Sequence, residues 1–283
     1  PGTGEYALAT TPVHYAYGVG VNRSANVHSM TGKTDMSASL DALSGELPNA
    51  TGASLVVSWF GNDLRCGSCA IQPKVEQADH DGIPMPWTVS GLARTQAALV
   101  PRVDQNPIYG GTPADASVTE AITALNAVGK AVTFYPFILM EQLTGNGLPN
   151  PWNGSLGQPE LPWRGRITLN QAPGQAGSAD RSAAAASEVA AFFGTAAPSD
   201  FAAVGQVVNY TGPPEWRYRR FILHYAHLCA AAGGVAAFCI GSEMRGLTQI
   251  RAPGDSFPSV AALRSLAQDV KTILGPKTKI SYA

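Results

Sequence analysis

The apolar residues of this chain form short continuous runs that alternate with longer helical stripes. Mostly apolar runs occupy Ser54–Phe60, Ala131–Met140 and Ala236–Ile240, and each is followed by small or polar residues. A short apolar run bounded by turn residues is typical of a strand that is buried on both faces. A further run begins at Ile280–Ala283, and a weaker one covers Gln96–Val103. We therefore predict four or five buried strands.

Helical patterns fill the intervals between these runs. In the interval before Ala131, Thr112 and Pro113 suit the cap and first position of a helix, and Gly129 suits its end. Strand, helix, short turn and strand in succession indicate a parallel sheet. The helices are predicted, from their amphipathic or alanine-rich composition, over residues 35–47, 113–128, 178–193, 215–232 and 256–274.

Long segments rich in glycine and proline follow the predicted strands. Residues 66–90 and 141–177 both begin just after a strand ends. In a (β/α)8 barrel, the loops after the strands build the face that carries the active site. Neither G-x-G-x-x-G nor G-x-x-x-x-G-K-[ST] occurs, so the usual marker of nucleotide-binding α/β folds is missing. We predict a TIM-barrel-like α/β fold with long loops after its strands.

The expected barrel is incomplete. About half of the eight strands use most of the 283 residues, so the chain is expected to hold the first half to two-thirds of the barrel. It begins with Pro1, and the run at its end stops early, as in a fragment of a longer protein. We predict a lead-in segment from an upstream domain over residues 1–50 and the incomplete barrel domain over residues 51–283.

The composition of the chain limits which classes of partner and cofactor we expect. A formal net charge of −1 gives no electrostatic reason to expect nucleic acid binding. No apolar run approaches the roughly 20 residues of a membrane-spanning helix. Cys66 and Cys69 form a lone C-x2-C pair without the further ligands that zinc requires, so a local disulfide and two free thiols remain open. We expect no metal and no cofactor.

Glu243 is the sharpest candidate for chemistry. It follows Gly241 and Ser242 directly after the run Ala236–Ile240, so it is expected at the carboxyl end of a buried strand. Glycosidases use a carboxylic acid to protonate the leaving oxygen, together with a second carboxylate. We predict a general acid/base role for Glu243. The alternative is an ion pair at the barrel rim, for instance with Arg245 or Arg65.

Other polar and aromatic residues follow the predicted strands and are expected on the same face. Asp63 and Glu141 are candidate catalytic carboxylates, or alternatively they cap loops or form ion pairs. Aromatic rings at strand ends could stack on sugars, or they could pack beneath the long loops. The aromatic candidates are Trp59, Tyr109, Tyr135, Trp152 and Trp163.

Six blocks of sequence, in order along the chain, resemble a single family. That family is the glycoside-hydrolase TIM-barrel-like domain of gene transfer agents and related phage tails, and the resemblance covers about residues 50–283. The blocks are Ser54–Arg65, Tyr109–Ser117, Val132–Met140 with Gly145–Pro149, Pro162–Arg166, Trp216–His224 and Ile240–Leu247.

The resemblance implies a component of a phage-like tail tip or baseplate. Such a component contacts other tail, baseplate and hub proteins and acts at the recipient cell surface or periplasm. Glu243 takes the acid position, with Asp63 and Arg65 as neighbours in the substrate cleft, and Ser242 stands where many glycosidases of this fold have asparagine. Two functions follow: a structural module that could bind cell-wall or capsule glycan, and an active hydrolase that degrades peptidoglycan or capsule.

Overall fold

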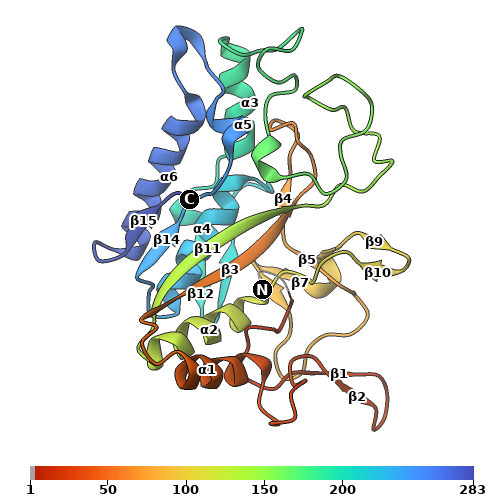
Figure 1. Ribbon diagram of the computed structural model, residues 1–283, viewed down its shortest axis with the longest axis vertical. Coiled ribbons are helices and arrows are strands. Elements are labelled where there is room, and N and C mark those ends of the chain that lie inside the picture. The colour runs from red at the N-terminus through yellow and green to blue at the C-terminus, as the bar shows by residue number, and fades with distance from the viewer. Residues whose placement is uncertain (1–3) are drawn as a thin grey trace.

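A five-stranded sheet forms the centre of the computed structural model, which describes residues 4–283 (Figure 1). Its strand order is β15-β14-β11-β3-β4, and all neighbours are parallel except β3 and β4. The parallel strands thus lie side by side in chain order, as successive units of a (β/α) barrel do. They are β3 (Gly52–Gly61), β11 (Ala131–Met140), β14 (Ala237–Cys239) and β15 (Lys279–Ser281), and β4 is Ile71–Gln72.

Helices lie between the parallel strands along the chain and pack on the sheet and on one another. Helix α2 packs against β11, and α4 packs against both β11 and α6. Figure 1 shows α4 beside β14, with α6 at the outer edge near β15. The helices are α1 (Asp35–Glu46), α2 (Asp115–Ala127), α3 (Ala183–Phe193), α4 (Tyr218–Ala231), α5 (Arg245–Thr248) and α6 (Pro258–Leu274).

Short elements occupy the long connections. The predicted strand over 96–103 is broken at Pro101 into two short strands, and neither joins the main sheet. The short strands are β1 (His14–Ala16), β2 (Asn22–Ser24), β5 (Lys74–Val75), β6 (Thr88–Val89), β7 (Leu92–Ala93), β8 (Ala98–Leu99), β9 (Arg102–Val103), β10 (Asn106–Pro107), β12 (Phe201–Val204) and β13 (Val207–Tyr210). The 3-10 turns are η1 (Arg94–Gln96), η2 (Arg164–Arg166), η3 (Pro198–Asp200) and η4 (Pro253–Asp255).

The two long strands β3 and β11 present different faces to the helices and to the barrel interior. Along β11, Phe134 is fully buried and packs on Tyr225 of α4 and Phe238 of β14. Tyr135 and Phe137 point to the opposite face and are half-buried. Because side chains alternate along a strand, one face of β11 belongs to the core beneath the helices and the other to the opposite side of the sheet. In a closed TIM barrel that opposite side is the interior.

Four helices, α2, α3, α4 and α6, begin two to five residues later than predicted. Helix α2 begins at Asp115 with Ala114 as its N-cap, and the predicted cap Thr112 lies outside the helix. The Thr112 hydroxyl instead donates to the Ser58 carbonyl at 3.0 Å and accepts from the Lys74 backbone N–H at 3.1 Å. The Thr112 side chain therefore forms tertiary hydrogen bonds and does not cap α2 as its place in the sequence predicted. Helix α3 begins at residue 183, five residues later than predicted.

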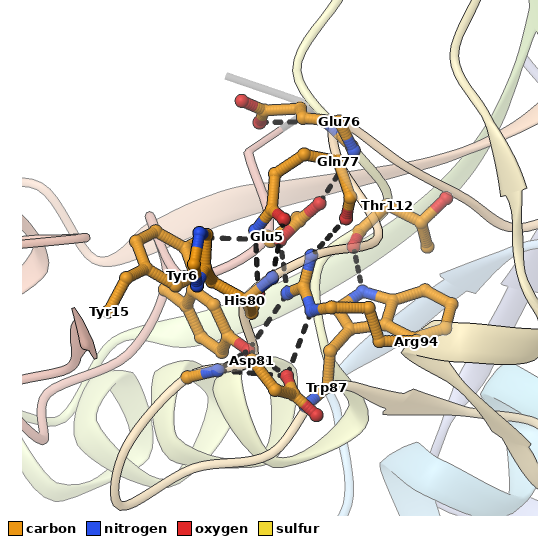
Figure 2. Close-up of polar contacts among 12 residues, drawn as sticks. Glu5, Tyr6, Tyr15, Glu76, Gln77, His80, Asp81, Trp87, Arg94 and Thr112 are labelled. Atoms are coloured by element: carbon orange, nitrogen blue, oxygen red, sulfur yellow. Dashed lines mark hydrogen bonds and ion pairs between the residues drawn. The ribbon is translucent and has the colours of Figure 1, made fainter. Parts of the chain in front are cut away.

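A buried polar cluster joins the N-terminal segment to the connection after β4 (Figure 2). Arg94 is only 1% exposed and forms an ion pair with Glu5. Its guanidinium also donates to Asp81 at 2.9 Å and to the Tyr6 hydroxyl at 3.1 Å. Residues before position 50 thus contribute buried contacts to the chain that follows. Within residues 4–283, no helix has the length and apolar character needed to cross a membrane.

Candidate functional site

Glu243 lies after the carboxyl end of β14, with its side chain 49% exposed. Its oxygen Oε2 accepts a hydrogen bond from the Trp163 indole N–H at 2.7 Å and lies 3.1 Å from the Arg164 guanidinium. The backbone φ of Glu243 is +56°, a left-handed value that is uncommon outside glycine. Strained backbone of this kind is concentrated at functional sites.

The predicted alternative of an ion pair at Glu243 is correct in kind but wrong in partner. The cation is Arg164 of η2, not Arg245 or Arg65. Arg164 is buried, lies 3.6 Å above the Phe137 ring of β11, and donates to the Ser242 hydroxyl at 2.9 Å. The long connection after β11 therefore folds back over the sheet and fixes the residues that follow β14. Arg164 and Ser242 are 78 positions apart, so no local sequence pattern could have predicted this contact.

A hollow of about 310 Å³ lies beside this ion pair. The loop around η2 supplies Trp163 and Arg166, and the short helix α5 supplies Arg245. The Trp152 indole N–H donates to the Arg166 carbonyl at 2.8 Å and so braces this wall. Two tryptophans and two arginines thus line one surface depression, and one of these tryptophans, Trp163, also binds the exposed carboxylate of Glu243. The full lining is Trp152, Trp163, Gly165, Arg166, Arg245, Gly246 and Gln249.

Asp63 and Glu141 are both buried and held by cations. The Asp63 carboxylate binds Arg65 at 2.6 Å and accepts from the Gln158 amide at 2.7 Å. Glu141 binds Lys74 at 2.7 Å. Burial raises the pKa of Glu141, and the nearby Lys74 charge opposes that rise. Both residues thus fit the ion-pair alternative, and among the described residues neither contacts Glu243 directly.

The aromatic residues predicted to contact sugars differ in exposure: some rings are accessible to solvent and others are buried. Trp59 is fully buried among the helices, where its indole N–H donates to the Tyr225 hydroxyl at 3.1 Å. This position fits the predicted alternative, in which the ring packs in the core and does not contact a sugar. Trp163 is 48% exposed, and Tyr135 lies on the inner face of β11, 5.9 Å from Phe137. Tyr109 is half-buried and packs 6.1 Å from Phe60.

The cysteines are free thiols enclosed by the core. Cys66, Cys69, Cys229 and Cys239 are all buried and unpaired by disulfides. Burial raises the pKa of the Cys69 thiol to about 12, and it raises the pKa of Cys66 as well. Because the thiolate is the reactive form, these groups are poor nucleophiles. Among residues 4–283, no three potential ligands group together to hold a metal ion.

The last quarter of the chain, residues 216–283, matches the model of a family described as "GTA TIM-barrel-like domain". The match spans α4, β14, Glu243 and α6. The parallel strands in chain order and this match together confirm the predicted fold class, a TIM-barrel-like α/β domain. The strands within residues 4–283 do not close a barrel. Among curated proteins, none matches this chain.

Two solved structures are similar at low identity. The first is a GH113 beta-mannanase, AaManA from Alicyclobacillus acidocaldarius, with 16% identity and a TM-score of 0.41 over 86% of this chain and 47% of that one. The second is a GH113 beta-1,4-mannanase with 13% identity and a TM-score of 0.39 over 87% of this chain and 48% of that one. The chain therefore spans about half the length of each mannanase.

Proposed function

We propose that this chain is a TIM-barrel-like module of a phage-like tail tip or baseplate, of the gene transfer agent type, that binds cell-wall or capsule glycan. It acts at the recipient cell surface or periplasm and contacts other tail, baseplate and hub proteins. The observation that carries the glycan proposal is the exposed carboxylate of Glu243 beside the indole-lined hollow. The family match over residues 216–283 supports the tail assignment.

The chemistry of the hollow suits a sugar. The C–H faces of a pyranose pack against aromatic rings, which Trp152 and Trp163 provide. Both protein donors to Glu243 contact Oε2, and among the described residues Oε1 has no hydrogen-bond partner. Because the Glu243 side chain is about half exposed, this oxygen can accept a hydrogen bond from a sugar hydroxyl. A few oriented polar groups over an apolar wall are the usual composition of a small-ligand site.

The second candidate function is glycan hydrolysis with Glu243 as general acid/base. Its position after a parallel strand and its left-handed backbone favour this reading. The mechanism also requires a second carboxylate near the scissile bond. Within the described residues, Asp63 and Glu141 are buried and engaged by cations, so neither is free for that second role.

A glycan assay separates these functions. We expect the chain to bind purified peptidoglycan or capsule, and Trp163→Ala to weaken binding by about 1 kcal/mol through loss of aromatic contact. Phe257→Ala is the matched control, because Phe257 is 47% exposed and lies outside the hollow. Release of reducing sugar that is lost in Glu243→Gln would establish hydrolysis. Equal release by both proteins would remove Glu243 from that role, and no binding at all would refute the glycan proposal.

The tail assignment has its own test. Antibodies against the chain should label purified phage-like particles from the producing cells at the tail tip in electron micrographs. If the antibodies detect the protein in the cell lysate but do not label the particles, the proposed place in the baseplate is contradicted.

A further inference from the structure

The hollow beside Glu243 carries an uncompensated positive charge. Its lining includes Arg166 and Arg245 but no aspartate or glutamate. Within residues 4–283, neither guanidinium forms an ion pair or a side-chain hydrogen bond. Arg166 has only a loose contact, 5.6 Å above the Trp152 ring. Two cations lining one depression repel each other unless an anion lies between them.

Glu243 does not neutralise these arginines. Its carboxylate is paired with Arg164, which is buried and also bound to Ser242. That pair is electrically balanced, so the charges of Arg166 and Arg245 remain. Arg245 is exposed and Arg166 is half-buried, so both are accessible from solvent. Arg164 is therefore buried and paired, whereas Arg166 and Arg245 are accessible and have no carboxylate partner among the described residues.

The wall that carries the arginines is held in place by close packing. A Cβ atom on Gly165 would lie 2.4 Å from the Trp163 ring, so this ring rests against the loop backbone. A Cβ atom on Gly246 would lie 2.7 Å from the Ile167 carbonyl oxygen, so α5 approaches the same loop at backbone distance. A site that is ordered before binding loses less entropy when its ligand arrives.

From these contacts, and building on the proposed glycan-binding function, we infer that the hollow selects acidic saccharides. Arg166 and Arg245 bind a carboxylate or phosphate group on the sugar, and the two indoles hold the ring. The guanidinium fork suits both anions because it presents parallel N–H donors to their oxygens. Hydrogen bonds to charged groups contribute about tenfold or more in affinity each.

The test titrates the full chain by tryptophan fluorescence with matched oligosaccharides. One pair is trigalacturonate and its fully methyl-esterified form, which keeps the rings and removes the charge. The other pair is a manno-oligosaccharide with and without a phosphate group. We expect an acidic member to bind at least tenfold more tightly than its neutral partner at low salt, and this preference to shrink as salt rises. The pair with the larger ratio identifies carboxylate or phosphate as the preferred group.

Single variants locate the selectivity. Arg166→Gln and Arg245→Gln should each weaken acidic binding about tenfold and lower the acidic-to-neutral affinity ratio by a similar factor. Arg264→Gln is the matched control, because Arg264 is an exposed arginine of α6 outside the hollow, and it should change neither. Thermal unfolding of each variant verifies the fold, and Arg245 is exposed enough that its replacement should leave stability intact.

The outcomes distinguish this inference from the function on which it rests. If acidic and neutral sugars bind equally, or if both glutamine variants keep the preference, the acidic selectivity is refuted while glycan binding stands. If the wild-type chain binds neither acidic nor neutral saccharides nor purified envelope glycan, both proposals fail.

Discussion

At the scale of the residue, burial separates three carboxylates that look equivalent in sequence. Glu243, Asp63 and Glu141 all follow parallel strands, yet only Glu243 is exposed. A buried carboxylate must be paired, because desolvation strongly disfavours an isolated charge. Local sequence shows the strand end but not the cation that reaches it from elsewhere. The choice among these three residues therefore had to come from the tertiary structure.

Lys74→Met should destabilise the protein in a pH-dependent way. Burial raises the pKa of Glu141 above its ordinary 4.5, so the folded state binds more protons than the unfolded state between those two values. The free energy of unfolding contributed by this group consequently falls as the pH rises through the folded pKa. Removing Lys74 raises that pKa further. We expect a loss of about 3 kcal/mol at pH 8 and a smaller loss at pH 5.

Urea unfolding at both pH values measures this effect. The double variant Lys74→Met, Glu141→Gln is the control, because it lacks the carboxylate that titrates and should lose the extra pH dependence. Parallel stability curves for wild type and Lys74→Met would contradict the assignment.

At the scale of the element, alternation along β3 and β11 decides which aromatic rings reach the barrel interior. Ile138 of β11 pairs in register with Trp59 of β3, and both are buried. Tyr135 pairs with Val56 on the opposite face. Proximity to a strand end therefore did not suffice to predict a sugar contact. The register and the helix layer determined which side of the sheet each ring occupies.

Gly246→Ala should test how closely α5 packs on the loop that carries Trp163. The added methyl group would lie 2.7 Å from a backbone oxygen, which cannot move as freely as a side chain. We expect a loss of about 1–3 kcal/mol in the free energy of unfolding, as for overpacked interiors. Gly45→Ala is the control, because this position in α1 has open space around it. It should gain about 0.4–1 kcal/mol. Equal effects of the two substitutions would argue against the close approach.

At the scale of the whole molecule, the buried cluster around Arg94 connects the predicted lead-in segment to the predicted barrel domain. Glu5 and Tyr6 supply two of the groups that bind the Arg94 guanidinium. The hydroxyl of Thr11 also donates to Glu120 of α2 at 2.6 Å. Residues 1–50 were expected to be a connection from an upstream domain. The contacts show that part of this segment also packs into the structure that follows.

A chain shortened to residues 51–283 should be less stable than the full chain. It would leave Arg94 buried without Glu5, and breaking a buried pair costs about 3–5 kcal/mol. Arg94→Met in the full chain should reduce the urea midpoint in the same direction. Lys33→Ala removes an exposed ion pair with Asp41 and should change stability by at most about 1 kcal/mol. An unchanged midpoint in the shortened chain would make residues 1–50 a separable segment.

The sequence by itself determined the fold class, the four parallel strands and the position of Glu243 at a strand end. These features follow from local rules, because apolar runs, helical stripes and the glycines that end helices can each be recognised within a short stretch of sequence. Only the tertiary structure decided that Arg164 pairs with Glu243, that Trp59 is buried, and that Arg166 and Arg245 share a hollow with two indoles. Those facts depend on long connections folding back across the sheet, and contacts between residues about 80 positions apart leave no periodic signal in the sequence.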